Sequence, residues 1–167
     1  DVILKEYCEI SEEDTLGTLH DRLKELGAIG LGKALKLIEE EKVQAEKQDE
    51  TKVSFVKPIT KEQTRINWND AKEVIYNQIR GLNPFPGAHT FTETGENVKI
   101  YKSEKIDKKY EGENGTIVEI INKKGPVVKT SNGGIILLEV KFEGKKLQSG
   151  TDIINGRKLT VGNKFKN

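Results

Sequence analysis

The stretch Arg80-Gly81-Leu82-Asn83-Pro84-Phe85-Pro86-Gly87-Ala88 lies near the middle of this 167-residue chain and separates two kinds of sequence. Its two prolines fix two backbone φ angles and remove two amide donors, so neither a helix nor a sheet ladder can continue through them. The pattern before the stretch, from Asp70 to Leu82, is helical, whereas short apolar runs separated by glycines follow it. As a physical pattern alone, the stretch predicts a rigid corner that connects a helix to a strand.

The sequence after this corner predicts five short strands. Turn signals rich in glycine and asparagine separate the apolar runs, and no helical pattern lies between them. Five strands at spacings of about ten residues are typical of a small closed antiparallel barrel. The expected strands are Ala88–Glu93, Asn97–Glu104, Gly115–Ile121, Pro126–Ser131 and Gly134–Phe142, and a short helix over Ser149–Asn155 is expected to follow them.

The first 41 residues predict one strand and two helices. Val2–Ile10 has the branched and aromatic content of a strand. Acidic and capping residues at positions 11–15 then precede leucines at 3.6-residue spacing, which indicate a helix with one apolar stripe. Gly27 is expected to break or bend this helix, and a second helical run is expected over Ile29–Ile38.

Residues 42–68 show little periodicity, apart from a short strand expected over Val53–Val56. We interpret them as a connector that Trp68 anchors to the rest of the protein. The helix before the corner is expected to begin at Asn69 or Asp70, with Glu73 completing a capping box if Asp70 is the cap. Its expected buried face consists of Ala71, Val74, Ile75, Ile79 and Leu82.

Composition bounds the possible classes of protein. With 34% hydrophobic and 33% charged residues, the chain has a globular composition, and no apolar run approaches the length of a membrane span. The single cysteine, Cys8, excludes an internal disulfide framework and favours a reducing compartment, so we expect a cytoplasmic protein. The chain contains no methionine, and we interpret it as part of a longer protein.

Charge is unevenly distributed along the chain. Residues 1–50 carry 7 basic and 14 acidic side chains, a net charge of −7, whereas residues 51–167 carry 21 and 13, a net charge of +8. A basic second half is compatible with a polyanionic partner such as RNA, although interleaved lysine and glutamate also form ordinary solvated surfaces.

No catalytic constellation is visible in the sequence. His20 follows an apolar helix position and favours a packing or surface role, His89 has no carboxylate nearby in sequence, and Cys8 lies in an expected strand. No cluster has metal-ligand spacing, and no glycine-rich phosphate loop joins a strand to a helix. We therefore predict no catalytic, cofactor-binding or metal-binding residue in this chain.

Several motifs resemble the second half of the methionyl-tRNA formyltransferase family. The central ones are Arg65-Ile66-Asn67-Trp68, Gln78-Ile79-Arg80, Asn83-Pro84-Phe85-Pro86-Gly87 and Val98-Lys99-Ile100-Tyr101-Lys102. Upstream, Thr15–Leu23 is similar to the last helix of that family's catalytic domain, and Gln48-Asp49-Glu50 is similar to its linker. Downstream, Gly144-Lys145-Lys146 and Gly162-Asn163 match its C-terminal pattern, so the resemblance spans the whole chain.

The resemblance implies an α+β fold class: a C-terminal OB-fold-like antiparallel β-barrel, preceded by a linker and a strand-helix-helix remnant of an α/β (Rossmann-like) formyltransferase domain. The implied domains are residues 1–41 as the catalytic remnant, 42–68 as the linker and 69–167 as the tRNA-binding barrel. The family's Asn/His/Asp set and folate pocket lie upstream of the part that resembles this chain, so the chain alone is expected to be inactive.

The implied reaction transfers a formyl group from 10-formyltetrahydrofolate to the amino group of methionyl initiator tRNA, and this chain would bind and position the tRNA. The intact enzyme is expected to be monomeric and to need neither metal nor membrane. The expected tRNA-binding residues are Lys57, Lys61, Arg65, Arg80, Lys99, Lys102, Lys145 and Lys146. Two alternatives stay open: a structural barrel from a folate-dependent formyltransferase or hydrolase acting on a small metabolite, and a free-standing RNA-binding barrel.

Overall fold

The computed structural model describes residues 1–167 as two units, residues 1–58 and residues 59–167. Residues 59–68, which the sequence analysis assigns to a linker, belong to the second unit because Ile66 and Trp68 are fully buried in its core. The division of the chain into functional domains stays a prediction.

The first unit contains one long helix, α1 (Leu16–Glu39), and a short 3₁₀ turn, η1 (Glu50–Lys52). Thr15 caps α1 in a capping box with Thr18, as the capping residues at positions 11–15 indicate. The predicted break at Gly27 is wrong. The helix runs through Gly27 without interruption, because a single glycine destabilises a long helix by only about 1 kcal/mol. No close packing requires a glycine at this position either, since a Cβ there would have open space around it.

The two strands predicted in the first unit are not formed. Between residues 1 and 10 only Val2 pairs, in an isolated bridge with Glu46, and residues 53–56 are exposed without strand pairing. Branched and aromatic residues favour a strand only where a neighbouring strand completes the hydrogen-bond ladder, and unit 1 supplies none. No residue of α1 is fully buried. In its leucine stripe Leu16 and Leu23 are exposed, whereas Leu19 and Leu26 are half-buried.

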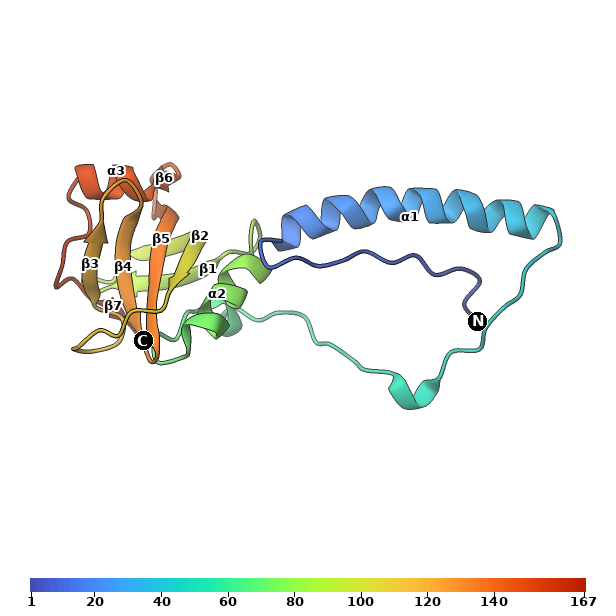
Figure 1. Ribbon diagram of the computed structural model, residues 1–167, viewed down its shortest axis with the longest axis horizontal. Helices are drawn as coiled ribbons and strands as arrows, with labels where there is room; N and C mark the ends of the chain where they lie inside the picture. The colour runs from blue at the N-terminus through green and yellow to red at the C-terminus, as the bar shows by residue number, and fades with distance from the viewer. The chain divides into compact units, whose positions relative to one another are not determined.

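The second unit is built on one curled antiparallel sheet (Figure 1). The strand order is β3-β4-β5-β2-β1-β7, and β6 pairs with β5. The elements after the 3₁₀ turn η2 (Glu62–Thr64) are α2 (Lys72–Gly81), β1 (Ala88–Thr92), β2 (Asn97–Ile106), β3 (Ile117–Ile121), β4 (Gly125–Thr130), β5 (Gly133–Phe142), β6 (Gln148–Ser149), α3 (Gly150–Asn155) and β7 (Phe165–Lys166). The five predicted strands and the last helix are therefore present, within one or two residues of their expected bounds.

Hydrogen bonds join the two ends of the sheet. The start of β3 and the residues before it bond to those around β7. The Ile117 N–H donates to the Asn163 carbonyl at 2.8 Å, and the Phe165 N–H donates to the Gly115 carbonyl at 2.9 Å. Gly115 has φ +84°, and a Cβ there would lie 2.9 Å from the Phe165 carbonyl oxygen. A glycine is thus required where the two ends meet. The predicted α+β class is confirmed, and the expected OB-fold-like antiparallel barrel takes the form of a curled antiparallel half-barrel.

A single apolar core fills the curled sheet and is completed by α2, α3 and Trp68. The Trp68 ring stacks on Phe165, with centroids 5.6 Å apart, and its Nε1 donates to the Thr90 hydroxyl at 3.0 Å. Figure 1 shows α3 at one end of the curled sheet, beside β6. No helix in the chain has the length and apolar character needed to cross a membrane.

Helix α2 begins later than the sequence indicates, because its N-terminus is capped from another part of the chain. The Lys72 N–H donates to Asn132 Oδ1 at 2.8 Å, and Asn132 Nδ2 donates to the Glu73 carboxylate at 2.9 Å. Asn132 and Lys72 together lower the pKa of Glu73 to about 2. Local capping by Asn69 or Asp70 therefore does not occur.

The buried face of α2 also differs from the prediction at Val74, and Ala71 is only half-buried. Ile75, Ile79 and Leu82 are buried as expected, but Val74 is 55% exposed. Lys72 is buried instead, and its ammonium pairs with Glu73 and Asp107. A long aliphatic stem can pack beside the core while its charged end reaches carboxylates, which hydropathy patterns do not register.

The predicted corner lies between α2 and β1. The Gly87 N–H, at φ +85°, donates to the Leu82 carbonyl at 2.9 Å, and Asn83 Nδ2 donates to the Tyr101 carbonyl at 2.7 Å. The peptide bonds preceding Pro84 and Pro86 are both cis. The corner is thus tied to both the helix and strand β2.

Candidate nucleic-acid interface

A row of nitrogen-bearing side chains crosses the outer face of the sheet. His89 on β1 lies opposite Lys99 on β2, and Lys99 lies opposite Lys141 on β5. Arg65 forms an isolated bridge with His89 and extends the row by one position. Directly paired residues of neighbouring strands point to the same face of a sheet. Because the flanking positions on β2 and β5 are core residues, this row faces outward.

The 3₁₀ turn η2 positions two of these cations. Lys61 is the N-cap residue of η2 and Arg65 is its C-cap residue. The turn therefore places these two cations at its two ends. The Arg65 guanidinium lies over the Phe91 ring, 5.5 Å from its centroid, and Nη2 donates to the Asn167 carbonyl. Arg65 therefore has a structural role besides its charge, whereas Lys61 is exposed and makes no ion pair.

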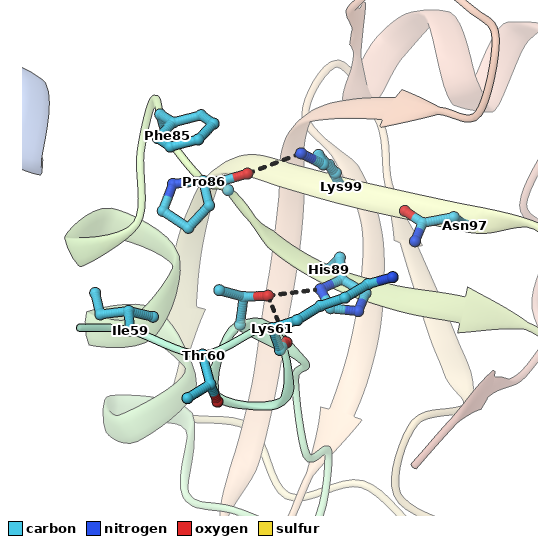
Figure 2. A pocket seen from close by; sticks show the side chains of 10 residues that line it. Ile59, Thr60, Lys61, Phe85, Pro86, His89, Asn97 and Lys99 are labelled. Carbon is cyan, nitrogen blue, oxygen red and sulfur yellow. Dashed lines mark hydrogen bonds between the residues drawn. The ribbon is translucent and has the colours of Figure 1, made fainter. Parts of the chain in front are cut away.

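A cavity of about 470 Å³ opens between η2, the corner and strands β1 and β2. Figure 2 shows Phe85 and Pro86 on one side, Lys99 and Asn97 along β2, and His89 in the middle. Lys99 Nζ donates to the Pro86 carbonyl at 2.8 Å. A Cβ at Gly87 would lie 3.3 Å from Lys99 Cδ, so the glycine leaves room for the lysine stem. The other residues that line the cavity are Ile59, Thr60, Lys61, Thr64 and Gly87.

The pKa of His89 is lowered from its ordinary value. Burial is the largest cause, because His89 is only 6% exposed, and the positive charges of Lys61, Arg65 and Lys99 add to it. The imidazole is consequently neutral at physiological pH, and the surrounding field favours anions.

A second hollow of about 290 Å³ adjoins the first and shares Asn97 and Lys99 with it. Tyr101 and Lys141 also line this hollow. Lys99 therefore lines two depressions on the outer face. Each combines an aromatic side chain with cations, although the second also contains the carboxylate of Glu143. This combination suits a phosphate backbone with unpaired bases.

The structure brings together part of the predicted tRNA-binding set. Lys61, Arg65 and Lys99 surround His89. Lys102 lies further along β2 in register with Glu139, which opposes its charge. Lys145 and Lys146 are exposed in the turn that follows β5.

The two other members of the predicted set lie elsewhere. Arg80 is in the last turn of α2, where its Nε donates to Asn77 Oδ1 at 2.8 Å. Lys57 belongs to the first unit. Neither residue is on the strands that form the row.

Sequence reasoning missed Lys141, the exposed Phe85 and the role of His89. Lys141 could have been found from the alternation in its strand, because it stands between the buried residues Val140 and Phe142. The environment of His89 has no local signal, since the cations around it come from η2 and β2. No group of three or more histidine, cysteine, aspartate or glutamate side chains is placed to hold a metal ion.

The family to which this fold belongs follows from comparison with known proteins. Residues 58–158 match the family described as formyl transferase, C-terminal domain, and the chain belongs to that family. Curated relatives that match nearly the whole chain include methionyl-tRNA formyltransferases. The one from Fusobacterium nucleatum is 48% identical over 99% of this chain and 53% of the relative, and the one from Bacillus subtilis is 40% identical over 97% and 51%. The chain thus spans about half the length of the curated relatives it matches.

Solved structures show the same fold at low sequence identity. A variant of HypX from Aquifex aeolicus has a TM-score of 0.65 with 14% identity, over 88% of this chain and 27% of that one. At this level of identity the likeness concerns the fold alone.

Proposed function

We propose that this chain is the C-terminal half of a cytoplasmic methionyl-tRNA formyltransferase and that its second unit binds the tRNA. Relatives of that name match nearly the whole chain at up to 48% identity. In this proposal the complete protein transfers a formyl group from 10-formyltetrahydrofolate to methionyl initiator tRNA. In this proposal the formyl donor binds, and the catalytic residues lie, in the part of the complete protein that this chain does not include.

The observation that carries the tRNA-binding role is the row formed by Arg65, His89, Lys99 and Lys141, with Lys61 beside it. The second unit carries 19 basic and 13 acidic side chains, and the ten residues that line the larger cavity include no carboxylate. Lysines and arginines on one face bind phosphates and release counterions, without reading sequence. We therefore expect the affinity for different tRNAs to be similar and to fall steeply with salt.

The test compares two variants with the same change in net charge. Lys61→Gln with Lys141→Gln removes two exposed cations that have no ion-pair partner, whereas Lys5→Gln with Lys33→Gln removes two lysines paired with Glu46 and Glu6 in the first unit. Affinity for tRNA is measured by fluorescence anisotropy over a series of KCl concentrations. The first variant should reduce the slope of log affinity against log salt by about 1.8, at about 0.9 for each lost phosphate contact.

The control variant should leave that slope unchanged. An equal loss of slope in both variants would mean that net charge, not this face, governs binding. Absence of any salt-sensitive binding at low ionic strength would favour the structural-barrel alternative. Separately, the 167-residue chain incubated with 10-formyltetrahydrofolate and methionyl-tRNA should give background formylation only, and turnover above background would place the chemistry in these residues.

A further inference from the structure

His89 presents one ring nitrogen to the cavity as a hydrogen-bond acceptor. The Thr64 hydroxyl contacts two groups, the Lys61 carbonyl at 2.8 Å and His89 Nδ1 at 3.0 Å. A carbonyl can only accept, so the single hydroxyl hydrogen of Thr64 is donated to Lys61, and Nδ1 must carry the hydrogen of the second bond. In the neutral imidazole the other nitrogen, Nε2, is then an acceptor, and it bonds to no protein group.

This acceptor is placed among the cations Lys61, Arg65 and Lys99. Lys61 extends alongside the His89 ring and Lys99 lines the same cavity (Figure 2). A phosphodiester pairs with the two ammonium groups, but it carries no hydrogen that it could donate to Nε2. A ligand that satisfies all three must combine an anionic group with a nearby hydroxyl or N–H donor.

Part of the remaining lining of the cavity is apolar and accessible, beside the polar side chains of Thr60, Thr64 and Asn97. Phe85 is 77% exposed and Ile59 is 54% exposed, and Pro86 lies between the phenyl ring and Lys99. An exposed aromatic ring beside cations provides a stacking surface for a nucleobase. The volume of about 470 Å³ is within the range of small-molecule sites and accommodates a single nucleotide.

We propose that this cavity binds one unpaired ribonucleotide, with its phosphate on Lys61 and Lys99, its base against Phe85 and its 2′-hydroxyl donating to His89 Nε2. The ribose 2′-hydroxyl is the donor that lies next to a phosphate in RNA and is missing from DNA. The proposal rests on the proposed function, because it assigns part of the tRNA-binding face a preference for RNA and for a single-stranded segment.

The experiment uses the 167-residue chain and one single-stranded 12-mer made only of A and C, in ribo, 2′-deoxy and 2′-O-methyl forms. The three probes have the same bases, and the last two lack the hydroxyl hydrogen. Anisotropy titrations of the unaltered chain should give about three- to tenfold tighter binding of the ribo form than of either other form.

Two histidine variants then locate the preference. His89→Phe keeps a ring of similar size beside Phe91 but has no acceptor, so it should bind all three probes with the affinity of the deoxy form. His20→Phe, on the exposed surface of α1, is the matched control and should keep the ribo preference. Phe85→Ala should weaken all three probes by about tenfold, because base stacking on the ring is lost for each of them.

Equal binding of the three probes by the unaltered chain would overturn the proposal even if His89→Phe failed to fold. A retained ribo preference in folded His89→Phe would also overturn it, with folding checked by circular dichroism. In either case salt-sensitive tRNA binding that depends on Lys61 and Lys141 would leave the proposed function standing. Failure of every probe and of tRNA to bind would overturn both.

Discussion

Replacing Trp68 with phenylalanine tests how the second unit holds the segment that carries Lys61 and Arg65. Trp68 is fully buried and stacks on Phe165. Its Nε1 donates to Thr90 Oγ1 at 3.0 Å, and its backbone N–H donates to Asn167 Oδ1 at 2.8 Å. Phenylalanine keeps the stacking and the backbone bond but removes one ring and the Nε1 donor.

The expected loss of stability follows from these contacts. The smaller ring leaves a void of roughly 40 Å³, which costs about 1 kcal/mol at about 24 cal/mol per Å³. Loss of the buried Nε1 bond adds about 1 kcal/mol, since Thr90 loses the donor that it accepts from. Together with the apolar area removed, the free energy of unfolding should fall by about 2–3 kcal/mol. For a unit of this size that corresponds to a decrease in melting temperature of about 10–20 °C.

Urea unfolding followed by far-ultraviolet circular dichroism is the appropriate assay, because Trp68 is the sole tryptophan and its fluorescence disappears in the variant. Val74→Ala is the control, since Val74 is an exposed residue of the neighbouring helix α2 and should change stability by less than about 0.5 kcal/mol. If Trp68→Phe lowered the free energy of unfolding by under about 1 kcal/mol, Trp68 would not anchor the segment as argued.

Three further predictions concern the closure of the sheet, the buried histidine and the first unit. Gly115→Ala should destabilise the second unit by about 1–3 kcal/mol in the same urea unfolding assay, because a Cβ at positive φ also meets the Phe165 carbonyl. Gly81→Ala has open space around the new Cβ and should be neutral or stabilising. The lowered pKa of His89 means that the unfolded chain binds the proton more readily, so stability present above pH ~6.5 should decline as pH falls toward the folded-state pKa. Urea titrations from pH 7.5 to 5 should show this decline in the unaltered chain and less of it in His89→Phe, and identical pH profiles would contradict the assignment. Amides of α1, which has no buried residue, should exchange with deuterium faster than those of β2, and equal protection would show that α1 is sheltered.

Local sequence determined the sheet elements of the second unit and the corner before them. Apolar runs bounded by glycine and asparagine turns located β1 to β5, and the two prolines located the point where α2 ends. These signals succeed because a turn needs particular backbone angles that few residues adopt. The motif resemblance also indicated the family directly, without any knowledge of the fold.

Only the tertiary structure decided which cations act together. Lys99 and Lys141 are neighbours through strand register, and Lys61 and Arg65 reach His89 because a 3₁₀ turn packs against β1. The cap of α2 by Asn132, the burial of Lys72 and the acceptor state of His89 Nε2 depend likewise on partners distant in sequence. The physical reason is that the electrostatic field at a site, the cap of a helix and the tautomer of a histidine depend on the groups that lie within a few ångströms. The distance between two residues in space cannot be read from their separation along the chain.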